Sequence, residues 1–203
     1  MIKLTIKGKD YFHASKIEEV TLDQWINLRT VQPEEGETTL KENIKAFSAF
    51  TGVPQKALRL IPKKELAYYM SEVIDRVTEV KAHIADSKPI HQFNIGKSTY
   101  YIEQDLDNAP LGQYSDCTHF MNQMASDEEF MPYMMAIYCL KKGQKHTDNM
   151  DELEKRAKTM RKARAMDALL IHAFFLTTSE DYARDSQLYM EVNPVMHKYK
   201  QDV

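Results

Sequence analysis

The fold is decided by the stretch TLKENIKAFSAFTGVP at residues 39–54, which carries the start, the apolar face and the end of one helix. Thr39 and Glu42 have the spacing of a capping box, in which the hydroxyl and the carboxylate each accept a backbone N–H of the first turn. Apolar side chains follow at the spacing of a single helix face: Ile44, Phe47 and Phe50. Because a glycine and a proline then supply the stop, the stretch predicts a helix over 40–51.

The same signals predict helices along most of the chain. Thr21 and Gln24 form a second capping box ahead of a helix of about ten residues that carries Trp25. Prolines favour the first turn of a helix, so Pro54 and Pro62 indicate a short helix near 54–60 and a longer one over 63–86. Further helices are expected over 110–125, 127–142, 148–176 (the longest) and 178–191.

Two short segments alternate apolar and polar residues, the pattern of β-strands. They cover residues 2–13 and 90–103, and each contains a turn with a glycine, Gly8 or Gly96. The fold class is therefore α+β, predominantly α-helical, with two short antiparallel β-hairpins. The expected core residues lie on the apolar sides of these helices: Trp25, Phe47, Phe50, Ile137, Leu170, Phe174 and Phe175.

The two halves of the chain resemble each other at a shift of about 89 residues. In each half a hairpin with a Gly-Lys turn precedes a helix that starts Leu-x-Gln-aromatic, at Leu22 and at Leu111. The chain is therefore divided into 1–88 and 89–203, each a hairpin plus a helical unit, either as an internal duplication or as one compact domain with a chance likeness.

Composition places the chain among ordinary globular proteins. It has 203 residues, 43% of them apolar and 28% charged, and a formal net charge of −3. We expect no membrane contact, because no apolar run reaches the roughly 18 residues of a span and the first residues alternate in charge. Cys117 and Cys139 are too few for a disulfide framework, which favours a reducing cytosol.

None of the common active-site motifs occurs, and the protein is predicted not to be an enzyme. Two cysteines and two nearby histidines could supply the sulfur and nitrogen ligands that zinc prefers: Cys117, His119, Cys139 and His146. They lack the close paired spacing of a zinc module, so we expect neither a metal nor an organic cofactor.

Charge is segregated along the chain. No Lys or Arg occurs from Ser98 to Leu140, whereas six basic residues and no acid occur from Lys155 to Arg164. Three interpretations remain open for this pattern: a solvated helix face, a nucleic-acid contact, and head-to-tail self-association that closes a ring. In the third, the candidate interface residues are Glu103, Asp105, Asp107, Asp127, Glu128 and Glu129 on the acidic side, and Lys155, Arg156, Lys158, Arg161, Lys162 and Arg164 on the basic side.

Several short motifs carry a resemblance to one group of proteins. They are Leu22-Asp23-Gln24-Trp25, Ala49-Phe50-Thr51-Gly52-Val53-Pro54, Ile95-Gly96-Lys97, Tyr100-Tyr101-Ile102, Asp105-Leu106, Leu111-Gly112-Gln113-Tyr114-Ser115-Asp116, Met134-Met135-Ala136-Ile137-Tyr138-Cys139-Leu140 and Phe174-Phe175. They are spread over most of the chain, from Leu22 to Phe175, and resemble small structural and assembly proteins of tailed bacteriophages, including the crAss-like phages. Members of this group are ring proteins below the portal or tail-assembly chaperones, and neither role has catalytic residues to carry over.

The resemblance implies a non-enzymatic virion structural protein, made in the bacterial host cytoplasm, that forms a homo-oligomeric ring in the portal-to-tail connector. Its implied partners are further copies of itself and the portal or other tail and connector proteins, with nucleic acid only in the ring lumen. One alternative is a tail-assembly chaperone that is absent from the mature virion. Another is a nucleic-acid-binding accessory protein or an enzyme whose site the sequence does not disclose.

Overall fold

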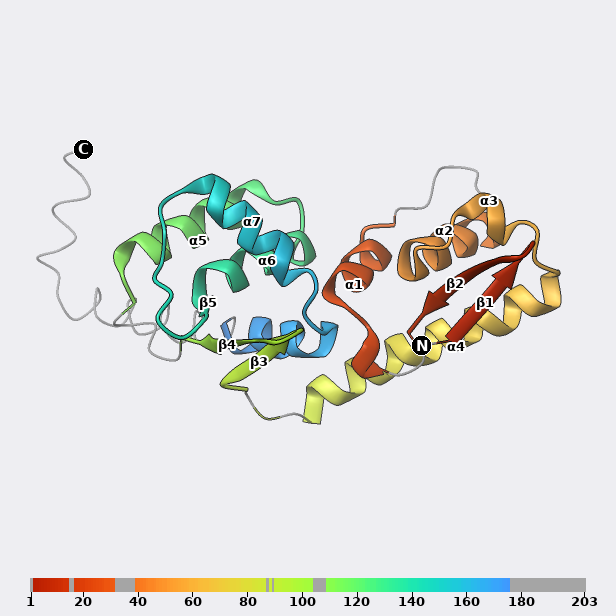
Figure 1. Ribbon diagram of the computed structural model, residues 1–203, viewed down its shortest axis with the longest axis horizontal. Helices are drawn as coiled ribbons and strands as arrows, with labels where there is room; N and C mark the ends of the chain where they lie inside the picture. The colour runs from red at the N-terminus through yellow and green to blue at the C-terminus, as the bar shows by residue number, and fades with distance from the viewer. Residues whose placement is uncertain are drawn as a thin grey trace, which may run out of the picture.

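The computed structural model describes residues 2–14, 17–31, 39–86, 88, 90–103 and 109–175 of the chain (Figure 1). Its first half contains β1 (Ile2–Ile6), β2 (Lys9–His13), the 3-10 helix η1 (Ile17–Glu19), α1 (Leu22–Arg29), α2 (Thr39–Thr51), α3 (Gln55–Leu58) and α4 (Lys63–Asp86). The second half contains β3 (Gln92–Ile95), β4 (Ser98–Ile102), α5 (Leu111–Gln123), α6 (Asp127–Tyr138), β5 (Cys139–Leu140), α7 (Met150–Met160) and a helix over 165–175. The α+β, predominantly helical class is confirmed, because helices make up most of the residues that the structure describes.

Both hairpins form where the alternating pattern predicts them. In the first, Ile6 pairs with Lys9 across a two-residue turn of Lys7 and Gly8, which have φ of 48° and 77°. Two positive φ angles in a two-residue loop are the geometry that matches the twist of the strands, and glycine adopts them without steric cost. The second hairpin pairs antiparallel strands β3 and β4 around a turn that starts at Gly96, with φ of 59°.

Apart from η1, α3 and β5, which occur in one half each, the elements of the two halves recur in the same order at an offset of about 89 residues. Each half runs hairpin, helix, helix and long helical segment: β1–β2, α1, α2 and α4, then β3–β4, α5, α6 and α7 with the 165–175 helix. Equivalent hairpin positions are buried in both halves, Leu4 with Phe93 and His13 with Ile102. This correspondence supports an internal duplication, while the division into 1–88 and 89–203 stays a prediction.

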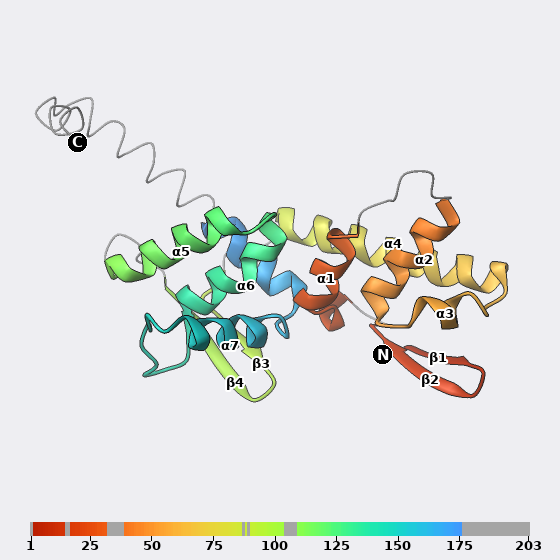
Figure 2. The ribbon, with the colours of Figure 1, turned by 90° about the horizontal axis from the view of Figure 1, so that it is seen from above.

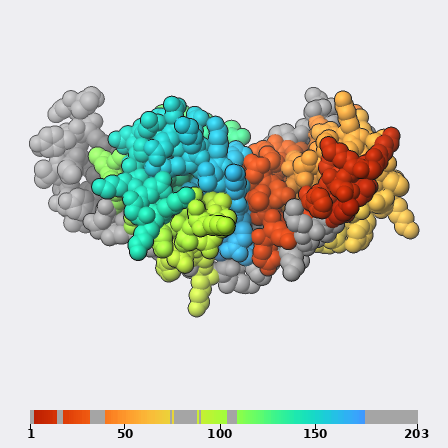
Figure 3. Space-filling view, viewed as in Figure 1, coloured from red at the N-terminus to blue at the C-terminus, as the bar shows by residue number. Residues whose placement is uncertain are grey.

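The two halves form two lobes side by side, and α1 lies at their junction (Figures 1 and 2). The space-filling view shows the surface of α1 meeting that of the 165–175 helix (Figure 3). Buried residues from both halves belong to one hydrophobic cluster. The two lobes therefore share one hydrophobic core.

Backbone hydrogen bonds close the junction at the start of α1. The first N–H groups of a helix have no partner within it, and here Leu22 N donates to Ala163 O at 2.8 Å and Asp23 N to Arg161 O at 2.9 Å. The acceptors lie just after α7, so the negative end of one helix meets the positive end of another. The predicted capping box is also confirmed, because Gln24 N donates to the hydroxyl of Thr21, 3.3 Å away.

The junction explains why the predicted helix over 148–176 is wrong as one element. The chain leaves the helix after Met160, turns through residues 161–164 and resumes a helix at 165. Within the turn Thr21 forms a β-bridge with Arg164, and Ala165 N donates to Val20 O at 2.8 Å. A continuous helix would keep these backbone groups for itself, so tertiary pairing overrides the local helical pattern.

The helix predicted over 127–142 is also too long. α6 ends at Tyr138, and Cys139–Leu140 form β5, which pairs antiparallel with β4. A short apolar run is compatible with either the end of a helix or a strand. Here residues 139–140 form a strand because their backbone pairs with β4. The expected helix over 178–191 lies outside the described residues.

The predicted core is confirmed at six of its seven positions. Trp25, Phe47, Phe50, Ile137, Leu170 and Phe175 are buried. Phe174 is only partly buried and packs against the edge of the core, because it lies 100° around the helix from Phe175. Among the described residues, no helix combines the length and the apolar character needed to cross a membrane.

Candidate functional site

The acidic candidates do not form one cluster. Glu103 follows β4, whereas Asp127, Glu128 and Glu129 occupy the first turn of α6, where negative charge is favoured by the helix dipole. Asp105 and Asp107 lie outside the described residues. The described acidic candidates are thus divided between the end of β4 in the three-stranded sheet, where Glu103 lies, and the start of α6.

Glu128 is engaged within the chain. Its carboxylate accepts a hydrogen bond from Arg29 Nε at 3.0 Å, which joins the start of α6 to the end of α1 across the two lobes. Partial burial raises the pKa of Glu128, but the hydrogen bond and charge of Arg29, together with bonds from the Glu128 backbone and Ser126, lower it by more, so the pKa ends below its usual value. The pair of Glu128 and Arg29 therefore joins the two lobes at the end of α1, in addition to the backbone bonds at its start.

The arginines of the basic segment also pair within the chain. Arg161 Nη1 lies 2.9 Å from Asp23 Oδ1, and Arg164 donates twice to Asp167 at 2.7 Å. Lys158 lies 3.7 Å from Glu154 on the same exposed face of α7. The side chains of Lys155 and Lys162 are exposed. Lys158, Arg161 and Arg164 are thus paired with acids of the same chain, and the charged interface stays a prediction.

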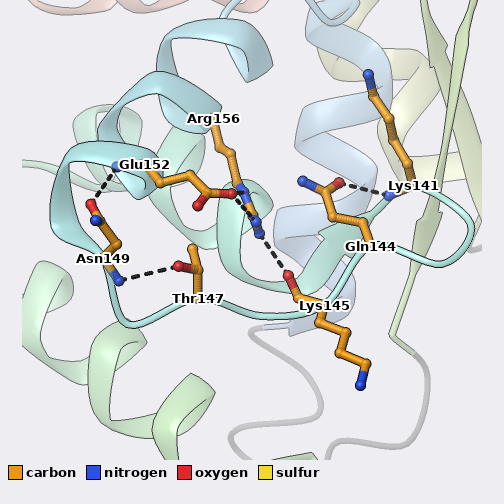
Figure 4. A network of polar contacts seen from close by, with 7 residues as sticks. All are labelled: Lys141, Gln144, Lys145, Thr147, Asn149, Glu152 and Arg156. Carbon is orange, nitrogen blue, oxygen red and sulfur yellow. Dashed lines mark hydrogen bonds and ion pairs between the residues drawn. The ribbon is translucent and has the colours of Figure 1, made fainter.

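Arg156 secures the loop that precedes α7 (Figure 4). It pairs with Glu152 one turn earlier and donates from Nη1 to the backbone oxygen of Lys145 at 3.2 Å. Asn149 caps the helix by accepting from Glu152 N at 3.1 Å, and Thr147 accepts from Asn149 N at 3.2 Å. These bonds give Arg156 a structural role in this chain.

An apolar groove runs between α2 and α4 in the first lobe. It has a volume of about 390 Å³ and is lined by Leu40, Asn43, Lys63, Leu66, Ala67, Met70 and Ser71. Leu40 is 49% exposed at its edge. A concave apolar surface with one basic residue on its rim suits another apolar protein surface better than a polar small molecule.

α5 carries an exposed apolar stripe in the second lobe. Leu111, Tyr114 and Met121 are 80%, 57% and 54% exposed. Their spacing places them on one side of the helix, because residues three, four and seven apart share a face. We call these three residues the α5 stripe. Exposed apolar groups that line up in this way mark surfaces for protein contact.

A second hollow, of about 410 Å³, lies beside the three-stranded sheet. It is lined by Tyr101, Ile102, Glu103, Gln113, Tyr138, Leu140, Lys141, Lys142 and Gln144. Gln113 is buried and donates from Nε2 to Ile137 O at 3.2 Å, so it holds α5 to α6. Of the predicted site residues, only Glu103 lines this hollow.

The two cysteines have raised pKa values. Burial is the main cause, and it raises the pKa of Cys117 to about 11 and also raises that of the fully buried Cys139. A thiol with so high a pKa is protonated at neutral pH and is a poor nucleophile and metal ligand. The geometry thus gives both cysteines a packing role.

Asp116, His146 and Asp148 form a cluster that the sequence did not disclose, although His146 was among the zinc-type residues. His146 Nε2 lies 3.0 Å from Asp116 Oδ2 and 3.5 Å from Asp148 Oδ1, and the three groups could hold a cation. Only two of them are held in place, because the Asp148 side chain is 93% exposed. Zinc sites use three or four protein ligands, so with two groups held in place the cluster fits better a contact between His146 and Asp116 within the chain.

Comparison with known proteins finds no family model, no curated protein and no solved structure that matches this chain. The phage resemblance therefore rests on the residues quoted above and enters only as a proposal. Sequence reasoning missed the α5 stripe and the groove, although Leu111 and Tyr114 were noted as part of the repeat. The helical spacing of the apolar residues can be seen in the sequence. Which of these residues a neighbouring element covers depends on tertiary packing, which the spacing does not show.

Proposed function

We propose that this protein is a non-enzymatic structural protein of a tailed bacteriophage, forming a homo-oligomeric ring in the portal-to-tail connector of the virion. One observation carries the assembly part of this proposal. The α5 stripe and the α2–α4 groove are two different exposed apolar surfaces, and they lie in different lobes (Figure 1). Two unlike surfaces on one chain suit a head-to-tail contact, which closes into a ring when the rotation per copy allows it.

The phage and connector part rests on the resemblance of the short motifs. Its expected partners are copies of this chain and the portal or neighbouring tail proteins, with nucleic acid reaching only the lumen of the ring. The protein would be made in the host cytoplasm and remain in the particle.

Mass spectrometry of purified virions tests the proposed location. A connector protein is present at a fixed number of copies per particle, whereas a tail-assembly chaperone, the alternative role, is found in the infected cell and not in the particle. Absence from washed, infectious virions would contradict the connector role.

A further inference from the structure

The two repeats contain one covered and one uncovered version of the same helix face. At the offset of 89 residues, Leu22 and Trp25 of α1 correspond to Leu111 and Tyr114 of α5. Leu22 is fully buried and Trp25 is 4% exposed, whereas Leu111 and Tyr114 are 80% and 57% exposed. Leu22 and Trp25 are thus covered by other parts of the chain, whereas the equivalent side chains of α5 remain exposed.

α1 packs on α2 within its own repeat, and a second surface that meets it comes from the second repeat. It consists of the start of α6, where Glu128 pairs with Arg29, and the segment 161–165 after α7. By the same offset, the corresponding positions of the first repeat are the start of α2 and residues 72–76 of α4, which directly follow Met70 and Ser71 at one end of the groove. The α2–α4 groove opens between these two helices and includes Leu40, the second residue of α2.

We propose that the α5 stripe of one copy docks into the α2–α4 groove of a second copy, repeating between chains the contact that α1 makes within the chain. This inference deepens the ring proposal and rests on it. The occupant is a second copy because α1 of this chain already packs in this way against the second lobe. The α2–α4 groove of the first lobe and the α5 stripe of the second lobe stay exposed. Each copy then offers one stripe and one groove, so the assembly is head-to-tail.

The contact between copies differs from the internal one in two respects. α4 continues as a helix where the second repeat breaks at 161–164, so its backbone carbonyls are not free to receive the N–H groups of α5. The residues corresponding to the ion-paired Asp23 and Arg29 are Gly112 and Thr118, which carry no charge. Docking therefore depends on apolar side chains, and we expect it to persist as salt increases.

Two variants block the two surfaces separately. Tyr114→Glu places a charge in the α5 stripe and leaves the groove intact, and Leu40→Glu does the reverse. Each is expected to weaken assembly about tenfold or more, as happens when a central interface anchor is lost. Gln123→Glu is the matched control, because it adds the same charge to an exposed position on the opposite side of α5 and is expected to assemble like the wild type.

Mixing the variants is the decisive step. In a head-to-tail contact, the intact stripe of the Leu40→Glu chain fits the intact groove of the Tyr114→Glu chain, and the mixture stops at a one-to-one heterodimer. Native mass spectrometry with one chain isotopically labelled measures this species directly. If each variant alone is monomeric and the mixture yields no heterodimer, the stripe-to-groove contact is overturned.

The remaining outcomes separate this inference from the ring proposal. If both variants keep the wild-type oligomer, the contact lies elsewhere and only the present inference fails. If the wild-type chain is monomeric at every concentration tested, both fail. Thermal unfolding followed by circular dichroism checks that each variant is folded, and Tyr114→Ser with Leu40→Ser replaces any glutamate variant that is not.

Discussion

Arg161 and Asp23 form an ion pair across the junction of the two lobes, with Nη1 2.9 Å from Oδ1, although 138 residues separate them in the chain. The same residues are joined by a backbone bond from Asp23 N to Arg161 O. The turn over residues 161–164, which the sequence predicts to be part of a long helix, is thus held by contacts with the first half of the chain.

The ion pair is expected to contribute little by itself. Both side chains are more than a third exposed, so a double-mutant cycle of Asp23→Asn and Arg161→Gln should give a coupling energy of about 0.2–1 kcal/mol. Urea unfolding of the four proteins measures it. A coupling energy above about 2 kcal/mol would show that the side chains, and not the backbone bonds, dominate the junction.

Adjacent phenylalanines provide a test of the core. Phe175 is 5% exposed and its ring centroid lies 4.8 Å from that of Tyr138, whereas Phe174 is only partly buried. Phe175→Ala should lower the free energy of unfolding by about 3–5 kcal/mol, and Phe174→Ala should cost clearly less. Equal losses in denaturant unfolding would show that the 165–175 helix packs differently.

The pair of Glu128 and Arg29 predicts acid sensitivity. Because the pKa of Glu128 is lower in the folded chain than in the unfolded one, its stabilising effect is complete above the ordinary glutamate pKa of about 4.3 and is lost as the pH falls through the folded value. The difference in melting temperature between wild type and Glu128→Gln should therefore shrink as the pH falls from about 6 to 3. A difference that stays constant with pH would remove this carboxylate from the junction's stability.

Purified protein is expected to contain no stoichiometric metal. Only Asp116 and His146 are held in place in the one three-residue ligand cluster found within the described residues. Elemental analysis of protein purified without chelator or affinity metal checks this. Zinc at one atom per chain, lost in Asp116→Asn and His146→Ala but not in Asp151→Asn, would prove the prediction wrong and identify the site.

Local chemistry made most of the fold predictable. The Lys7-Gly8 turn, the Thr21 and Gln24 capping box and the helix predicted over 40–51, which forms as α2 over Thr39–Thr51, each depend on residues close in sequence, and each is confirmed. The two errors, at 139–140 and at 161–164, occur where the backbone pairs with residues far along the chain. No local pattern encodes those partners.

The candidate site was less predictable for the same reason. The sequence shows that charges are segregated, but it does not show that Arg161, Arg164 and Glu128 are paired within the chain. The exposed lysines give the fairer test of a charged interface. Lys155→Glu with Lys162→Glu is expected to change assembly little, because the proposed contact is apolar. Weaker assembly with a smaller salt dependence would instead indicate a charged interface.

Assembly of the chain with itself into a closed ring is measured most directly by native mass spectrometry of the full-length protein at low and moderate salt. We expect one dominant oligomer of more than two copies that persists at moderate salt, because a head-to-tail contact that closes has a fixed number of copies and apolar contacts are not screened. A chain that remains a monomer, or stops at a symmetric dimer, would contradict closed-ring assembly.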